Sequence, residues 1–171
     1  MKIVQKHLLS GMGKQKGSSL ILKAGTARLF SSDFANVDPS SIRVNRFNVG
    51  VFLNPHPAKV QKGGEDAAVV TDNVIAVADG VGGWAESGVD PAKYSRMLCT
   101  NIDSLVTADI NGAKYQDDPR QLLIDAAAET RETGSCTCAI ATVDRLEPIV
   151  HTCNLGDSGY LLLRKSGLDL I

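Results

Sequence analysis

The chain has 171 residues, of which 43% are apolar and 22% are charged, and its formal net charge is −1. This composition suits one globular domain with a hydrophobic core, and the near-neutral charge excludes the basic footprint of a nucleic-acid-binding protein. No apolar run reaches the roughly 18 residues that a membrane-spanning helix needs, which excludes an integral membrane protein.

The N-terminal segment differs in charge from the rest of the chain. All 19 acidic residues lie at or after Asp33, whereas residues 1–32 contain lysine, arginine and serine but no acid. A basic, acid-free leader of this kind is typical of a mitochondrial transit peptide, and a disordered basic tail is the alternative. We therefore predict a transit peptide at 1–32, a linker at 33–46 and a mitochondrial, matrix location, with plastid or cytoplasm as lesser alternatives.

Two apolar runs after the linker predict a β-hairpin that carries acidic residues at one end. Residues 67–70 and 74–78 form the two strands, with a turn at Asp72-Asn73. Glu65, Asp66 and Asp79 then fall at the same end of adjacent antiparallel strands. Three carboxylates without Cys or His indicate a site for a hard cation, Mg²⁺ or Mn²⁺.

The glycines after Asp79 allow other interpretations. Gly80, Gly82 and Ala85 match the spacing of a dinucleotide-binding loop, but Asp79 would repel a pyrophosphate and Pro91 interrupts the helix that such a loop requires. Taken alone, the Asp79-Gly80 pair is most simply a turn. Together the acidic and glycine motifs favour a functional site.

The remaining segments supply a scaffold. Asp90-Pro91 and Asp118-Pro119 are helix start signals, so we expect helices from 91 to about 106 and from 119 to about 132, joined by a polar connection at 112–118. Short β-rich runs follow at 136–143, 149–155 and 160–163, with a hairpin turn at 156–159 between the last two. This order predicts an α+β fold in which an antiparallel sheet packs its helices on one face.

The four cysteines lack zinc-site spacing. Cys136 and Cys138 fall on the same face of one predicted strand, and we interpret them, with Cys99 and Cys153, as small buried hydrophobic residues.

Four motifs occur in an order that resembles a known family. They are Gly-Gly-Glu65-Asp66, then Asp79-Gly80-Val-Gly-Gly-Trp, then Gly134-Ser-Cys-Thr, then Gly156-Asp157-Ser-Gly. The chain from 47 to 163 resembles the metal-dependent serine/threonine phosphatases of the protein phosphatase 2C family, most of all their mitochondrial branch. The resemblance implies an antiparallel β-sandwich flanked by helix pairs, of which 47–171 would be the N-terminal part, about half of the domain.

The resemblance also implies a mechanism and roles for individual residues. Phosphoserine and phosphothreonine in proteins would be hydrolysed by a metal-activated water, with two Mn²⁺ or Mg²⁺ ions and possibly a third. Asp79 would bridge the two ions, Gly80 would bind one ion through its carbonyl, and Glu65 would complete that ion's shell with water. Asp66 would hold metal-bound water, and Asp157 would contact the third, weaker ion.

Departures from the family pattern leave a second hypothesis open. Val81 stands where many members have His, and Gln61 stands where many have a phosphate-binding Arg, which leaves Lys59, Lys62 or the metal alone to hold phosphate. The later acidic motifs of the family would follow Ile171. The alternative function is therefore a catalytically incomplete, phosphatase-like module that binds phosphoprotein or metal.

Overall fold

The computed structural model describes residues 44–109, 113–166 and 169–170. The predicted transit peptide and most of the predicted linker lie outside the described residues. The strands are β1 (Asp66–Val70), β2 (Val74–Gly80), β3 (Cys136–Val143), β4 (Val150–Leu155), β5 (Lys165–Ser166) and β6 (Asp169–Leu170). The helices are α1 (Pro91–Ala108) and α2 (Pro119–Glu129), with the short 3₁₀ helices η3 (Pro57–Lys62) and η4 (Gly82–Ser87).

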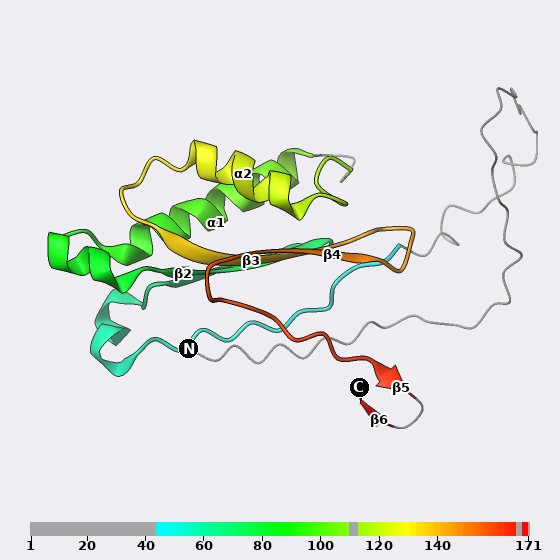
Figure 1. Cartoon of the computed structure of the whole chain (residues 1–171), viewed down its shortest axis with the longest axis horizontal. Helices are drawn as coiled ribbons and strands as arrows, with labels where there is room; N and C mark the ends of the chain where they lie inside the picture. Colours follow the sequence, from blue (N-terminus) through cyan, green and yellow to red (C-terminus); the bar gives the residue numbers. More distant parts are fainter. Residues whose placement is uncertain (1–43, 110–112, 167–168, 171) are drawn as a thin grey trace, which may run out of the picture.

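The four long strands form one antiparallel sheet in the order β1-β2-β3-β4, and β5 pairs only with β6. Both α-helices lie on one face of the four-stranded sheet, while the chain before β1 and after β4 runs along the other face (Figure 1). The α+β prediction, with an antiparallel sheet and a helix pair on one face, is confirmed. Within the described residues, no helix is long and apolar enough to cross a membrane.

Alternation along the strands determines which side chains enter the core. Successive residues of a strand point to opposite faces, so alternate apolar positions of β1, β2 and β3 face the helices. The core contains these strand residues and the apolar stripes of α1 and α2: Ala67, Val69, Val74, Ala76, Ala78, Cys138, Ile140, Leu98, Ile102, Leu122 and Ala126. All four cysteines are free thiols. Cys99, Cys136 and Cys138 are buried, as predicted, whereas Cys153 is only half-buried.

Local capping accounts for the helix boundaries. The Asp90 side chain accepts a hydrogen bond from the Ala92 amide at 3.1 Å, and Asp118 accepts one from the Gln121 amide at 2.9 Å. Both predicted N-termini are therefore confirmed. The C-terminus of α2 comes three residues earlier than expected.

Side chains link the end of α2 to α1. The Thr130 hydroxyl donates to the Ala126 carbonyl at 2.9 Å, and the Asn101 amide of α1 donates to the same carbonyl at 3.3 Å. The same carbonyl also accepts the Thr130 amide at 3.1 Å, which is its helical hydrogen bond, so the Asn101 side chain adds a link between α2 and α1. Thr130 itself is extended, with a ψ of 114°, and the helix ends there.

The predicted strand at 160–163 is wrong. The chain leaves the sheet after Leu155, and residues 160–164 form no strand. The hydroxyl groups of Tyr160 and Thr152 lie 2.7 Å apart. The segment therefore crosses the face of the sheet opposite the helices instead of pairing with the edge of β4.

This crossing leaves an apolar cavity of about 160 Å³ on the face opposite the helices, which we call the outer face. Strand residues Ile75, Val77, Ala139 and Ala141 form its floor, and Phe47, Tyr160, Leu161 and Leu162 border it. Leu161 and Leu162 remain 82% and 55% exposed. The outer face is thus only partly covered by the described residues.

Candidate functional site

The β1–β2 hairpin brings two acidic residues together. Asp66 at the start of β1 is the direct partner of Asp79 near the end of β2. The turn lies at the opposite end, where the Thr71 hydroxyl accepts a hydrogen bond from the Val74 amide at 2.8 Å. The predicted register and turn are confirmed.

Both carboxylates are on the outer face of the sheet. Their neighbours Ala67 and Ala78 are buried against the helices, so alternation directs Asp66 and Asp79 the other way. Asp79 is exposed and Asp66 is half-buried. The pair lies at the edge of the apolar outer face, open to a ligand.

Asp66 has a strongly altered acidity. Burial, then the negative charge of Asp79 and a hydrogen bond to its side chain, raise the pKa of Asp66 to about 6. The charge of Glu65 raises this pKa further, by a smaller amount. Two adjacent carboxylates that repel each other form a site where a cation is stabilising.

Gly80 allows the end of β2 to pack closely against the start of α1. A Cβ atom at position 80 would lie 2.3 Å from the carbonyl oxygen of Pro91, the first residue of α1. The Gly80 amide donates to the Glu65 carbonyl at 3.0 Å. Glycine is needed here because the helix backbone approaches the strand so closely.

Glu65 does not join the two aspartates directly. Its side chain forms an ion pair with Lys59 of η3, and its carbonyl oxygen also accepts a 2.6 Å hydrogen bond from Ser95. Among the residues that the structure describes, no three His, Cys, Asp or Glu side chains form a group that could hold a metal ion. Two of the three predicted carboxylates are thus adjacent, and the third contacts a lysine.

Asp157 lies in the turn after β4, at the same end of the sheet. Leu155 pairs with Cys138, and the neighbouring Thr137 pairs with Asp79. The hydroxyl groups of Thr137 and Ser158 lie 2.5 Å apart, which fastens the turn to β3. The Asp157 side chain is exposed.

Gly156 permits this fastening. Its φ of +85° is in the left-handed region, and a Cβ atom there would lie 2.8 Å from a methyl carbon of Thr137. The roles of Thr137 and Ser158 were not predicted, although both residues lie within motifs that the sequence analysis identified.

The Ser135 motif supports the loop that follows Gly80. The Val81 amide donates to the Ser135 carbonyl at 3.0 Å, and the Trp84 indole donates to the Ser135 hydroxyl at 2.8 Å. These bonds hold η4 against the start of β3. Trp84 therefore stabilises the position of η4 through its indole hydrogen bond, a role that the sequence analysis did not predict.

Burial makes the thiols behind the sheet poor nucleophiles. Burial raises the pKa of Cys99 to about 12, with a smaller contribution from the Cys136 thiol. It raises the pKa of Cys136 to about 11, with a smaller contribution from Asp79. Thiolate chemistry at this sheet is therefore suppressed at neutral pH.

Known proteins similar to the chain are protein phosphatases. Over 134 residues it is 42% identical to "Probable protein phosphatase 2C 26" of Arabidopsis thaliana, covering 74% of this chain and 43% of the relative. It is 39% identical over 120 residues to "Probable protein phosphatase 2C 1" of Oryza sativa subsp. japonica, covering 68% of this chain and 35% of the relative. "Protein phosphatase PTC7 homolog fig" of Drosophila grimshawi is 39% identical over 116 residues, covering 62% and 36%.

A solved structure agrees with these relatives. The X-ray structure of the photosystem II phosphatase PBCP matches with a TM-score of 0.50 and 42% identity, covering 57% of this chain and 38% of that one. A scan against models of protein families gives no match. The chain spans less than half the length of these relatives.

Proposed function

Because the chain belongs to the protein phosphatase 2C family through the segment it shares with these relatives, we propose that the protein hydrolyses phosphoserine and phosphothreonine in proteins with Mn²⁺ or Mg²⁺. The observation that carries the proposal is the pairing of Asp66 with Asp79 on the outer face of the sheet. It supplies two carboxylates at an open edge, next to a backbone that approaches closely at Gly80.

The residues present fit a hard cation. Asp66 and Asp79 repel each other, which a divalent ion would relieve, and the available donors are carboxylate and carbonyl oxygens. Asp79 and the Gly80 carbonyl would hold the ions, and Glu65, together with water, would complete the shell of the ion that Gly80 binds. Asp66 would orient water, and Asp157 would contact a third ion.

The chain's own groups would prepare the reaction. Bound divalent ions supply an acidified water and offset the charge on the phosphoryl oxygens. Asp66 would accept a hydrogen bond from the attacking water and align it. The hydrogen bond from the Gly80 amide to the Glu65 carbonyl holds the start of β1 against the end of β2, next to Asp66 and Asp79.

A chimaera tests the proposal. Residues 47–163 would replace the matching segment of the Arabidopsis relative, and hydrolysis of p-nitrophenyl phosphate and of a phosphoserine peptide would be measured. We expect activity only with Mn²⁺ or Mg²⁺ and none with EDTA. Asp79→Asn should remove nearly all turnover, whereas Asp72→Asn, at the turn end of the same hairpin, should retain it. Equal activity of the two variants would contradict the assignment of Asp79.

We further propose mitochondrial import, with residues 1–32 as transit peptide and 33–46 as linker to the phosphatase segment 47–171. The support is the acid-free, basic composition of the leader. A fluorescent reporter fused to residues 1–36 should enter mitochondria. A reporter that stays in the cytosol or enters plastids would refute this location.

A further inference from the structure

Glu65, one of the proposed metal ligands, already contacts a lysine, Lys59. The Lys59 ammonium group contacts the Glu65 carboxylate, and this side-chain pair is one of two ion pairs among the described residues. The Glu65 side chain is 16% exposed, whereas that of Lys59 is 42% exposed. The carboxylate is thus held in the protein, while the lysine reaches it from solvent.

The backbone around this pair is firmly held. The Glu65 carbonyl accepts bonds from Gly80 and Ser95, as described above. The Arg96 guanidinium of α1 donates to the carbonyls of Lys62 and Gly64, each at 3.1 Å. Separation of Lys59 from Glu65 therefore requires a movement of side chains only.

The pair also borders the loop that follows Asp79-Gly80. A Cβ atom at Gly82 would lie 3.4 Å from the Glu65 carboxylate and 3.4 Å from the Lys59 nitrogen. The charge of Glu65 acts on the Asp66 carboxyl as well. The ammonium group therefore lies at the edge of the acidic site and not on a remote surface.

We propose that Lys59 is an exchangeable internal cation of this site, an inference that rests on the proposed function. Without metal it neutralises Glu65. A divalent cation that recruits Glu65 displaces the ammonium group, which becomes available to the phosphate of the substrate. Lys59 would thus couple cation binding to phosphate binding, and its flexible four-carbon stem suits the exchange.

The first test measures metal affinity without any catalytic readout. Mn²⁺ is titrated into the 171-residue chain, followed by water proton relaxation, for the wild type, Lys59→Met and Lys62→Met. Because Lys59→Met removes a competitor whose ion pair has the strength of a surface salt bridge, we expect about two- to fivefold tighter Mn²⁺ binding. Lys62→Met, on the same 3₁₀ helix but without a Glu65 contact, should bind like the wild type.

The second test measures the coupling. Inorganic phosphate is titrated calorimetrically with saturating Mn²⁺ present. Loss of a charged hydrogen bond to phosphate should weaken its binding about tenfold in Lys59→Met. Lys59→Arg, which keeps the charge, and Lys93→Met, which changes an exposed lysine of α1, should bind phosphate like the wild type. Circular dichroism checks that all variants fold alike.

Several results would overturn the inference. They are equal Mn²⁺ affinity of Lys59→Met and the wild type, no Mn²⁺ binding by either, or phosphate affinity that Lys59→Met leaves unchanged. Failure of the proposed function gives a different result, because Asp79→Asn in the chimaera would then retain its metal-dependent turnover.

Discussion

Asp66 and Asp79 oppose folding when no cation is present. Since the pKa of Asp66 is about 6 in the folded chain and about 4 in an unfolded one, the folded state binds more protons between these values. The free energy of unfolding therefore falls as pH rises from about 4 to 6, and the full cost is present above pH 6.

Asp66→Asn should remove this cost. We expect the metal-free variant to be more stable than the wild type by roughly 1–2 kcal/mol at pH 7, because an uncharged amide replaces the repelled carboxylate. This gain is smaller than the full pKa shift implies, since solvent screens the charge of the half-buried Asp66 carboxylate. Below pH 4 the gain should vanish. Urea unfolding at both pH values measures it, with Asp72→Asn as the control. A gain of equal size at both pH values would contradict the electrostatic explanation.

Gly80 should tolerate no side chain. Gly80→Ala places a methyl group against the Pro91 backbone, and overpacking of this kind costs about 1–3 kcal/mol. Gly83→Ala is the matched control, because no atom lies within 4 Å of its ideal Cβ position. Denaturant midpoints of the two variants compare the effects, and equal midpoints would show that α1 can move away from β2.

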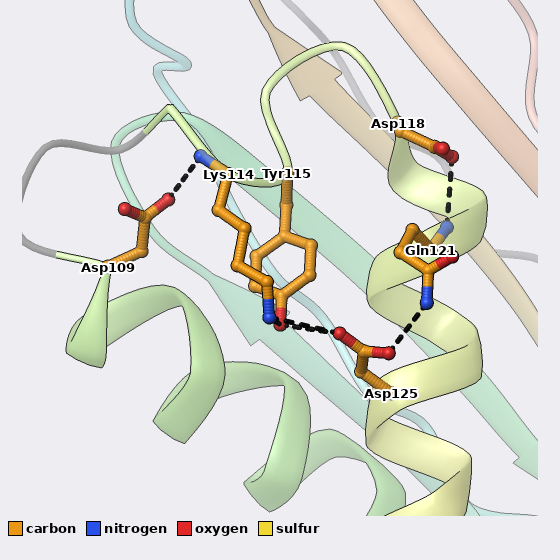
Figure 2. A network of polar contacts seen from close by, with 6 residues as sticks. All are labelled: Asp109, Lys114, Tyr115, Asp118, Gln121 and Asp125. Atoms are coloured by element: carbon orange, nitrogen blue, oxygen red, sulfur yellow. Dashed lines mark hydrogen bonds and ion pairs between the residues drawn. The ribbon is translucent and has the colours of Figure 1, made fainter.

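At the scale of elements, side chains of the α1–α2 connection attach it to α2. The polar sequence of this connection did not predict such contacts. Tyr115 is buried, and its hydroxyl donates to Asp125 of α2 at 2.9 Å (Figure 2). Lys114 donates to the same tyrosine oxygen and forms an ion pair with Asp125 at 3.1 Å. The connection is therefore part of the packed structure.

Tyr115→Phe tests this anchor. The variant keeps the buried ring but leaves Asp125 with one donor fewer, so we expect a loss of about 1 kcal/mol in the free energy of unfolding. Tyr160→Phe removes an exposed hydroxyl bonded to Thr152 and should cost less. If both substitutions cost the same in thermal unfolding, the Lys114–Tyr115–Asp125 contacts do not anchor the connection.

The features predicted correctly from the sequence depend on local interactions. The hairpin register follows from apolar alternation and an Asp72-Asn73 turn, and the helix starts follow from the caps at Asp90 and Asp118. These features place Asp66 beside Asp79 without knowledge of the rest of the fold.

The features missed depend on contacts that the periodicity of strands and helices does not describe. Residues 160–163 have a strand-like apolar run, but Tyr160 contacts Thr152 across the outer face instead of pairing with β4. Glu65 follows the same local logic as Asp66, yet its side chain contacts Lys59. The partner of each of these side chains depends on which group lies nearest in the folded chain, and the spacing of residues in the sequence does not predict this.

At the scale of the whole molecule, the sheet is protected on one face only. The helices cover one side, whereas residues 44–56 and 156–164 cross the outer face as irregular chain (Figure 1). Large apolar side chains there remain exposed, among them Phe52 at 75% and Leu161 at 82%. Exposed apolar surface of this extent favours association.

The 171-residue chain by itself should therefore self-associate through the outer face. Analytical ultracentrifugation should detect dimers or larger species at micromolar concentration. The double variant Leu161→Glu, Leu162→Glu should shift the chain toward monomer, because charges at the cavity rim are costly to bury. Ile124→Glu is the control, since Ile124 is exposed on α2, on the helix side of the sheet. If Ile124→Glu abolishes association and the double variant does not, the contact lies on the helices. If the wild type is monomeric, the segments that cross the outer face shield it sufficiently from association.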